Sequence, residues 1–334
     1  MKSIPVTIFC GFLGAGKTTM INKLLESRKT RNPFIIINEF GSVSIDGELV
    51  TEIDPDKIYQ MNNGCLCCVA SNDLVSVFAN VMTLIESGEA NIDSVLIELS
   101  GLADPGPVIQ TVLNTPYMSD YFHIDSVYTL VDVGNIREQL TLYQESLPQI
   151  AYADRVLLSK FIPERFDRRI IKELHTINPF VDVQTLDLQD LQYEQYIGLN
   201  LFEGNHEDKD DFEERLGFMM QQFNDYHHHS HEKNHCHHSS INSFTITSHQ
   251  SFSVKVIEEW LHHVIKRYGE RILRFKGIVG VEGYDNKLII QGVNTWFQLD
   301  KGSRWTDMPE TKIVFIGNSL PEDEIKNLLQ ATGI

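Results

Sequence analysis

The chain has 334 residues, which predicts one or two domains, and 42% of them are hydrophobic, enough to bury a large core. Lysine and arginine number 28 against 46 aspartates and glutamates, so the formal net charge of −18 excludes binding to nucleic acid or to an anionic membrane by bulk electrostatics. Five cysteines, an odd number, fit reduced thiols better than a disulfide framework, and no apolar run is long enough to span a membrane, so a cytoplasmic protein is expected.

The first part of the chain alternates strand-like and helical stretches as far as about residue 188. Short apolar runs predict strands at Val6–Cys10, Phe34–Asn38, Lys57–Met61, Ser94–Leu99, Ser126–Asp132, Arg155–Ser159 and Val181–Leu186. Between them, helices are predicted at Lys17–Arg28, Asn72–Ser87, Gly134–Glu145 and Arg165–Ile177. This alternation predicts an α/β domain, residues 1–200, with a mostly parallel sheet flanked by helices.

Residues 201–242 have a different character and are predicted to form a linker. An acidic stretch, Glu203–Asp211, leads through a short helical stretch, Phe212–Phe223, to a tract rich in histidine. Residues 243–334 then show strands at Ser243–Thr247, Ile272–Val281, Leu288–Val293 and Ile313–Ile316, and helices at Val254–Tyr268 and after Pro321. We expect this last part to be a smaller α+β domain.

The first predicted strand runs directly into residues 11–18, which read GFLGAGKT and match the pattern G-x-x-x-x-G-K-[ST] in full. Glycines in this pattern let successive backbone N–H groups point at a phosphate, at the N-terminus of the following helix. Lys17 is expected to bridge the β- and γ-phosphates, and Thr18 to ligate Mg²⁺. The loop therefore predicts nucleotide binding. Because the chain is acidic overall, the phosphates must be bound by local groups, here the backbone N–H groups and Lys17, and not by the net charge.

A later predicted strand ends in Glu98-Leu99-Ser100-Gly101. An acidic residue at such a strand end can hold the coordination shell of Mg²⁺, and the N–H of a following glycine can sense the γ-phosphate. The alternative is a carboxylate that is merely solvated at the end of a strand. Beside the phosphate loop, the Mg²⁺ role of Glu98 is the favoured interpretation.

Residues 63–68 read NGCLCC and place Cys65, Cys67 and Cys68 within four positions. A single intervening residue does not suit a standard zinc knuckle, yet two or three thiolates could share one Zn²⁺ or Cu(I) ion. The alternative is that the cysteines pack as small hydrophobic side chains. Upstream, Glu39 and Asp46 either serve a metal or Mg²⁺-bound water, or are solvated charges of a loop.

Residues 226–238 read YHHHSHEKNHCHH, and seven of the twelve positions from 227 onward are histidine. Neutral imidazoles coordinate Zn²⁺, Ni²⁺, Co²⁺ or Cu²⁺, and a cysteine adds a thiolate. The alternatives are an expression tag or a neutral polar linker, but a tag would be terminal and uninterrupted. We predict metal capture by His227, His228, His229, His231, His235, Cys236, His237 and His238.

Taken together, these motifs resemble those of the CobW family of P-loop GTPases, relatives of the urease and hydrogenase nickel-chaperone GTPases. The N-terminal motifs are GFLGAGKTT from Gly11, NEFG from Asn38, GCLCC from Gly64 and ELSGLADPGPVIQT from Glu98. Three C-terminal segments resemble the family's second domain: LRFKGI from Leu273, IQGV from Ile290 and VFIG from Val314. The resemblance covers nearly the entire chain and includes the YjiA-like bacterial members.

The resemblance implies a slow GTPase that uses Mg²⁺ and couples hydrolysis to delivery of a metal, usually Zn²⁺ with Co²⁺ or Ni²⁺ as alternatives, to a client metalloprotein. The site it implies comprises Gly11, Gly14, Ala15, Gly16, Lys17, Thr18 and Thr19 for the phosphates, Ser159 and Lys160 near the base, and Glu98 and Gly101 as Walker B residue and γ-phosphate sensor. It further implies a metal at Cys65, Cys67 and Cys68, with Glu39 as a neighbouring ligand. The resemblance, and no feature of the sequence itself, also implies a homodimer that forms around the nucleotide.

Two positions depart from the family pattern. Ser42 stands where members often have a second glutamate, and a hydroxyl is a poor zinc ligand. The guanine-reading element is normally NKxD, whereas residues 159–162 read SKFI, and Ile162 cannot accept hydrogen bonds from the guanine N1 and N2 positions. GTP remains the expected nucleotide, with relaxed base selectivity as an open alternative. The residue that positions the attacking water is left open among Glu39, Asp46 and Asp104.

Two other classes of function stay open. A P-loop kinase for a small molecule would release nucleoside diphosphate only with an acceptor present and would ignore metal. A passive zinc store with a structural nucleotide would bind metal whether or not GTP and Lys17 are present. A cysteine cluster and a histidine tract have no evident role in phosphoryl transfer to a small molecule, which favours the metallochaperone cycle.

Overall fold

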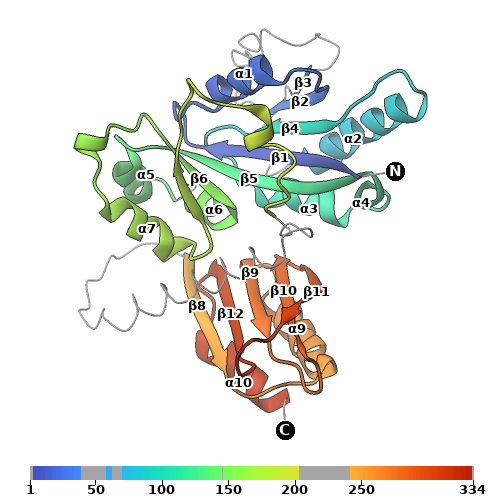
Figure 1. Cartoon of the computed structure of the whole chain (residues 1–334), viewed down its shortest axis with the longest axis vertical. Coiled ribbons are helices and arrows are strands. Elements are labelled where there is room, and N and C mark those ends of the chain that lie inside the picture. Colours follow the sequence, from blue (N-terminus) through green and yellow to red (C-terminus); the bar gives the residue numbers. More distant parts are fainter. Residues whose placement is uncertain (1–2, 39–57, 62–69, 145, 203–240, 333–334) are drawn as a thin grey trace. The chain divides into compact units, whose positions relative to one another are not determined.

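The computed structural model describes residues 3–38, 58–61, 70–144, 146–202 and 241–332 (Figure 1). These residues form two compact units. The first comprises the described residues up to 171 together with 181–202, and the second comprises residues 172–180 together with the described residues from 241 onward.

The first unit is built on a seven-stranded sheet in the order β3-β2-β4-β1-β5-β6-β7. Its strands are β1 (Ile4–Gly11), β2 (Pro33–Asn38), β3 (Ile58–Met61), β4 (Ser94–Glu98), β5 (Phe122–Asp132), β6 (Arg155–Ser159) and β7 (Asp182–Thr185). Every neighbouring pair in this order is parallel, which confirms the expected sheet. Because parallel strands all end at one edge, the segments that follow β1, β4, β5 and β6 leave the sheet on the same side.

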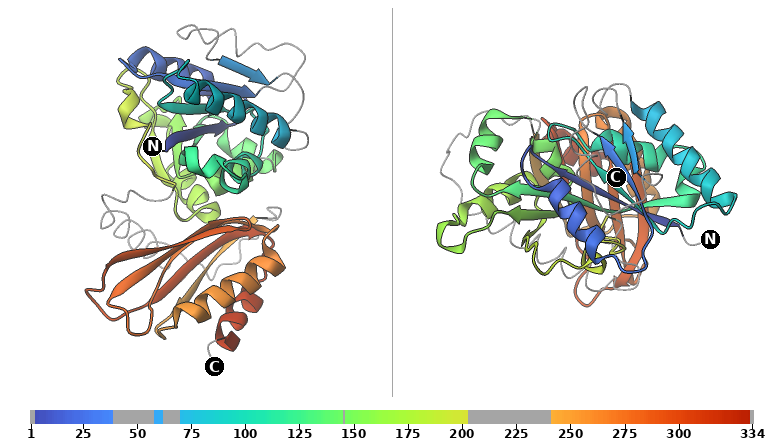
Figure 2. Two further views of the ribbon diagram at one scale, coloured as in Figure 1. Left: turned by 90° about the vertical axis from the view of Figure 1, so that its right-hand side faces the viewer. Right: turned by 90° about the horizontal axis from the view of Figure 1, so that it is seen from above.

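Helices cover both faces of this sheet (Figures 1 and 2). The helices of this unit are α1 (Lys17–Ser27), α2 (Ala70–Glu86), α3 (Gly106–Asn114), α4 (Met118–Tyr121), α5 (Ile136–Leu142) and α6 (Ser146–Tyr152), with 3₁₀ turns η3 (Pro163–Arg165) and η4 (Tyr193–Gln195). Helix α7 (Arg169–Ile177) begins in this unit, and its residues from 172 onward belong to the second. The neighbours Ile8 and Phe9 on β1 point to opposite faces, and both are fully buried. Phe9 belongs to the core that α1 closes. Burial on both faces explains why these strands read as continuous apolar runs rather than alternating ones.

Two features of the first unit differ from the sequence-based expectation. The helix predicted over Gly134–Glu145 is shorter, α5, and a further helix, α6, begins at Ser146. Pro148 lies in the first turn of α6, where its missing N–H costs nothing, but it could not lie inside a helix continuing from α5. Helix α3 follows Pro105 and was not among the predicted helices.

The second unit contains a five-stranded antiparallel sheet in the order β11-β10-β9-β12-β8. The strands are β8 (Ile241–Ser248), β9 (Ile272–Val279), β10 (Asn286–Val293), β11 (Trp296–Arg304) and β12 (Thr311–Asn318), and the helices are α9 (Val254–Tyr268) and α10 (Glu322–Thr332). Figure 2 shows both helices against one face of the sheet. The expected smaller α+β domain is thereby confirmed. Strand β11 was not predicted, because it is an edge strand whose residues are mostly half-buried and give no apolar signal.

Helix α9 illustrates how local sequence and packing agree in this unit. Ser253 precedes the helix, and its hydroxyl accepts a hydrogen bond from the N–H of Val256, which caps the N-terminus. Trp260 and Val264, four residues apart, are fully buried in the core against the sheet. The ring of Trp260 meets that of Phe315 edge to face, with centroids 5.9 Å apart.

Candidate functional site

Three glycines between the end of β1 and the start of α1, Gly11, Gly14 and Gly16, have positive φ angles that favour glycine. At Gly11 the φ angle is 133°, and a Cβ atom there would lie 2.3 Å from the carbonyl oxygen of Leu130 on β5. At Gly16, immediately before α1, φ is 97° and a Cβ would meet nothing, so the left-handed conformation alone requires glycine. The loop thus turns sharply and brings the N-terminus of α1 to the edge of the sheet, where partial positive charge favours an anion.

Lys17, the first residue of α1, curls back over this loop. Its Nζ donates hydrogen bonds to the carbonyl oxygens of Gly11 at 2.7 Å and Phe12 at 3.3 Å, and the residue is only 7% exposed. The N–H of Ala15 also donates to the carbonyl of Phe12, which closes the loop on itself. A buried ammonium is therefore held against the loop by the carbonyls of Gly11 and Phe12.

Thr18 and Glu98 form an oxygen-rich pair beside the loop. The Thr18 hydroxyl donates to Glu98 Oε1 at 2.7 Å, and Glu98, at the end of β4, is 3% exposed. Strand β4 pairs directly with β1, where Phe9 lies opposite Glu98. A hydroxyl and a carboxylate are hard oxygen ligands of the kind that Mg²⁺ selects, so these two residues fit the ion that the sequence predicted.

The turn after β4 is held tightly against the loop. A Cβ atom on Gly101 would lie 2.6 Å from the backbone nitrogen of Leu13, so the two backbones approach as closely as glycine allows. Gln149 on α6, 1% exposed, donates from Nε2 to the carbonyls of Gly101 at 3.1 Å and Ala103 at 3.0 Å. The sequence signals Gly101, but nothing local signals Gln149, which lies 48 residues further along the chain.

Two titratable groups, one half-buried and one fully buried, lie near this turn. Burial raises the pKa of Asp104, whose Oδ1 accepts a hydrogen bond from the N–H of Gly106 at 2.8 Å. Cys10, at the end of β1, is fully buried, and burial raises the pKa of its thiol despite the nearby Lys17. Because metals bind the thiolate, Cys10 serves as a packing residue.

Ser159 and Lys160 lie where β6 ends, and the structure joins them to β5. Ser159 Oγ donates to the carbonyl of Val131 at 3.3 Å, and Lys160, with φ of 53°, places its Nζ 2.7 Å from Asp132 Oδ2. Burial alone would raise the pKa of Asp132, but the hydrogen bonds from Lys160, Gly134 N–H and the side chain of Asn135, with the charge of Lys160, lower it. Asp132 therefore lies in the candidate site, although sequence reasoning did not single it out.

Much of the predicted metal chemistry lies outside the described residues. This applies to Glu39, Asp46, Cys65, Cys67 and Cys68, and to the histidine tract with His227, His228, His229, His231, His235, Cys236, His237 and His238. Among the residues that the structure describes, no group of three or more histidine, cysteine, aspartate or glutamate side chains could hold a metal ion. Strands β2 and β3 end at Asn38 and Met61, at the same edge of the sheet as the loop after β1.

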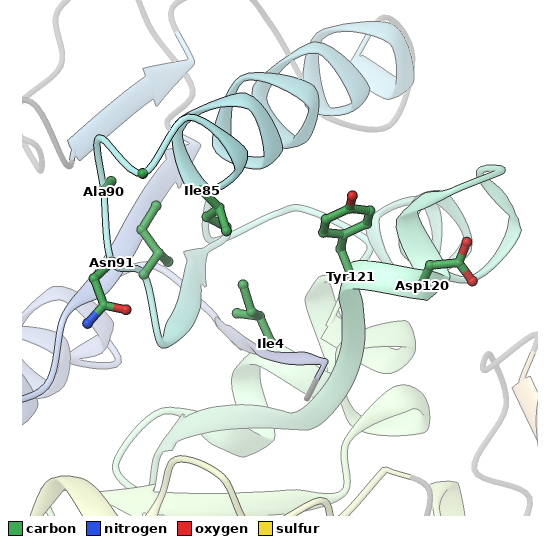
Figure 3. Close-up of a pocket in the computed structure, with 8 residues that line it drawn as sticks. Ile4, Ile85, Ala90, Asn91, Asp120 and Tyr121 are labelled. Carbon is green, nitrogen blue, oxygen red and sulfur yellow. The ribbon is translucent and has the colours of Figure 1, made fainter. Parts of the chain in front are cut away.

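A cavity of about 320 Å³ in the first unit belongs to a different part of the sheet (Figure 3). Ile4, Ile92 and Tyr121 line it, at or just before the starts of β1, β4 and β5. Figure 3 shows Ile4 and Ile85 between Asn91 on one side and Tyr121 with Asp120 on the other. The cavity therefore lies at the amino-terminal edge of the strands, away from the phosphate loop, and is not part of the candidate site. No described helix is long and apolar enough to cross a membrane.

Comparisons with known proteins agree with this geometry. Residues 5–184 match the family "CobW/HypB/UreG, nucleotide-binding domain", and residues 241–332 match "Cobalamin synthesis protein cobW C-terminal domain". Over 331 residues the chain is 30% identical to the zinc chaperone YjiA of Escherichia coli, covering 98% of both chains. It is 24% identical to the zinc-regulated GTPase metalloprotein activator 1 of Saccharomyces cerevisiae, covering 99% of this chain and 84% of that protein.

A solved structure shares the fold over the whole chain. The crystal structure of Zn(II)-bound YjiA GTPase from E. coli has a TM-score of 0.69 to this structure at 23% identity, covering 99% of each chain. The similarity therefore extends over both units and is not limited to the phosphate-loop domain.

Proposed function

Because this chain belongs to the CobW/HypB/UreG family of P-loop GTPases, we propose that it hydrolyses GTP to GDP and phosphate and uses that cycle to deliver zinc to a client metalloprotein. The observation that carries the hydrolytic half is the arrangement of Lys17 beside the Thr18–Glu98 pair at the end of β4. The metal half is supported by the zinc-chaperone relatives and by the cysteine and histidine motifs of the sequence.

In the proposed reaction, water attacks the γ-phosphate while the chain's own groups position and stabilise it. Lys17 exchanges its contacts with the Gly11 and Phe12 carbonyls for oxygens of the β- and γ-phosphates, and the loop N–H groups donate to the same phosphates. Thr18 and Glu98 would hold Mg²⁺, which neutralises charge that develops on the phosphate oxygens. Gln149 fixes the turn that carries Gly101, whose N–H then faces the γ-phosphate.

We propose that the delivered ion is held by Cys65, Cys67 and Cys68, with Glu39 as a neighbouring ligand, and that it is zinc in preference to nickel or cobalt. The support is chemical: thiolates suit zinc, and the similar protein YjiA of Escherichia coli is a zinc chaperone. The strands that precede these positions, β2 and β3, end at the nucleotide edge of the sheet. The histidine tract would collect metal before transfer.

In this proposal, the zinc affinity of the protein depends on whether GTP or GDP is bound. If GTP in place of GDP changes zinc affinity at the cysteines, zinc must change the relative affinity for GTP and GDP by the same factor. A chaperone cycle needs this difference, since release to a client requires a state with lower metal affinity.

The test measures GTP turnover and the dissociation constants of GTP and GDP, each with and without Zn²⁺. We expect zinc to change at least one of them in the wild type and in Cys236→Ala, and to have no such effect in Cys67→Ala. Zinc-independent values in the wild type would contradict the coupling. Stoichiometric zinc binding that ignores GTP and survives in Lys17→Ala would instead identify a passive metal store.

A further inference from the structure

The Thr18–Glu98 pair, which fits Mg²⁺ and the terminal phosphates, lies on the β4 side of β1, so the nucleoside of a bound nucleotide extends to the other side, toward β5 and β6. Strand β6 is two places from β1 in the sheet, and neighbouring strands are about 4.8 Å apart, so its end lies about 10 Å to the side of the phosphate loop. That offset matches the reach of a nucleoside extending from a phosphate held at Lys17. The residues after β6, from Lys160 to Ile162, are therefore the ones that meet the base.

Asp132, a carboxylate at the end of the neighbouring strand β5, already accepts three hydrogen bonds. Its Oδ1 accepts from Gly134 N–H at 3.0 Å, and its Oδ2 accepts from Asn135 Nδ2 at 2.9 Å and Lys160 Nζ at 2.7 Å. Asp132 is only 5% exposed. This carboxylate positions Lys160 and is not placed to read the edge of a purine.

Beyond Lys160, the exposed side chain on this segment is that of Ile162, which consists of hydrocarbon alone. Phe161 packs on Phe166, with ring centroids 4.9 Å apart, which fixes the loop and leaves the next side chain, Ile162, 46% exposed. Although its ammonium is hydrogen-bonded to Asp132, the Lys160 side chain is 58% exposed. An exposed isoleucine two residues after an exposed alkyl stem offers apolar surface suited to packing against a flat ring.

Two further carboxylates follow in the described part of this loop. Asp167 is bound by Arg169 and, at 2.8 Å, by Arg137, and these arginines hold the pKa of Asp167 far below its usual range. Glu164 lies two residues beyond Ile162 and is exposed in η3. Residues 161–163 themselves are Phe, Ile and Pro and offer no side-chain acceptor.

We infer that this chain binds the purine by packing it on Lys160 and Ile162, with no carboxylate of the described residues reading the guanine N1 and N2 donors. Its substrate class is then purine nucleoside 5′-triphosphates in general, with GTP one member beside ITP and ATP. This inference rests on the proposed nucleotide hydrolysis and deepens it. Asp132 acts as a positioning residue through Lys160.

Hypoxanthine provides a sharp comparison, because it differs from guanine only by the missing 2-amino group. A site that pairs this group with a carboxylate loses a charge-assisted hydrogen bond on the change, which corresponds to about tenfold or more in affinity. A site that packs only on the ring faces loses little.

The experiment titrates the full chain with GDP, IDP and ADP in the presence of Mg²⁺ by calorimetry, since diphosphates avoid turnover. In the wild type we expect the three dissociation constants to agree within tenfold. Ile162→Asp supplies the missing acceptor and should favour GDP over IDP and ADP by at least tenfold more than the wild type does. Ile162→Leu, of similar volume and equally apolar, should keep the wild-type ratios.

A wild-type preference for GDP over IDP or ADP of tenfold or more overturns the inference and leaves the proposed GTPase function intact. Unchanged ratios in Ile162→Asp overturn it as well, because position 162 would then not face the base. Binding of none of the three nucleotides overturns both the inference and the proposed function. Comparable binding without triphosphate hydrolysis upholds the base inference and contradicts only the hydrolysis.

Discussion

The hydroxyl of Thr18 donates a 2.7 Å hydrogen bond to Glu98 Oε1, which joins the start of α1 to the end of β4 across 80 positions of sequence. The hydrogen bond holds together a hydroxyl and a carboxylate, oxygens of the kind that Mg²⁺ binds, so a shared ion would need little further ordering of either side chain.

Replacing either partner should therefore remove hydrolysis more than it removes nucleotide binding. We expect Thr18→Ala and Glu98→Gln each to lower the rate of GTP hydrolysis by about 100-fold, because the charge on the transferring phosphate loses its metal-mediated stabilisation. Phosphate release measured over a range of Mg²⁺ concentrations checks this. Thr18→Ser keeps the hydroxyl and should retain most of the rate; equal losses in Thr18→Ser and Thr18→Ala would contradict a ligand role.

Gly101 offers a test of the contact between the turn after β4 and the phosphate loop. A methyl group there would meet the Leu13 nitrogen at 2.6 Å, so the loop must move away. We expect Gly101→Ala to weaken GDP binding by about tenfold and to lower the free energy of unfolding by about 1–3 kcal/mol, the usual range for overpacking. Isothermal titration and urea unfolding measure the two effects. Leu102→Ala changes the neighbouring exposed side chain and should alter neither by as much.

Gln149 is expected to support the same turn through its two hydrogen bonds. Its amide holds the carbonyls of Gly101 and Ala103, and Gln149→Leu would leave both acceptors buried without that donor. We expect a loss of about 2 kcal/mol in the free energy of unfolding, within the range for buried unsatisfied groups, and a lower hydrolysis rate with a smaller change in GDP affinity. Gln144→Leu, also near the start of α6, serves as the matched control. A Gln149→Leu enzyme with the wild-type rate would show that the turn needs no such support.

Sequence alone could predict the parts of this molecule that depend on local pattern. The glycine and lysine spacing of residues 11–18 requires one loop geometry, and the cap and apolar spacing of α9 fix its bounds at Val254–Tyr268. The strands of the parallel sheet could be located because burial on both faces leaves an uninterrupted apolar run.

The parts that could not be predicted depend on distant partners. Gln149 can be recognised as a candidate-site residue only once the fold brings α6 against the turn after β4. Asp132 can be recognised only once β6 pairs with β5. Strand β11 is stabilised by its pairing with β10, from Trp296 to Arg304, although its own residues are largely polar. Such positions carry no local signal, since their role is created by strand order and helix packing.

Asp125 gives a prediction about the pH dependence of stability. It is fully buried on β5, where its carboxylate accepts from Thr7 Oγ1 at 3.0 Å and from the N–H groups of Gly198 at 3.0 Å and Asn200 at 2.5 Å. Burial nevertheless raises its pKa, because these hydrogen bonds, with the nearby His123, offset only part of the desolvation.

The sign follows from proton binding. A raised pKa means that the folded state holds this proton more tightly than the unfolded state does, so between the unfolded and folded pKa values the free energy of unfolding falls as pH rises. Asp125→Asn cannot ionise, and its free energy of unfolding should decrease less than that of the wild type between about pH 4 and the folded pKa, where one proton contributes up to ~1.4 kcal/mol per pH unit. At pH 7 the variant should still be less stable by about 1–3 kcal/mol, since an amide cannot accept all of these donors.

Urea unfolding at several pH values from 4 to 8 measures both effects, with Asp190→Asn, an exposed position, as the control. The control should follow the wild-type pH dependence. If Asp125→Asn follows it too, the carboxylate does not bind its proton more tightly in the folded state. If only the loss at pH 7 is seen, Asp125 anchors the segment around Gly198 and Asn200 without coupling the stability of the nucleotide domain to pH.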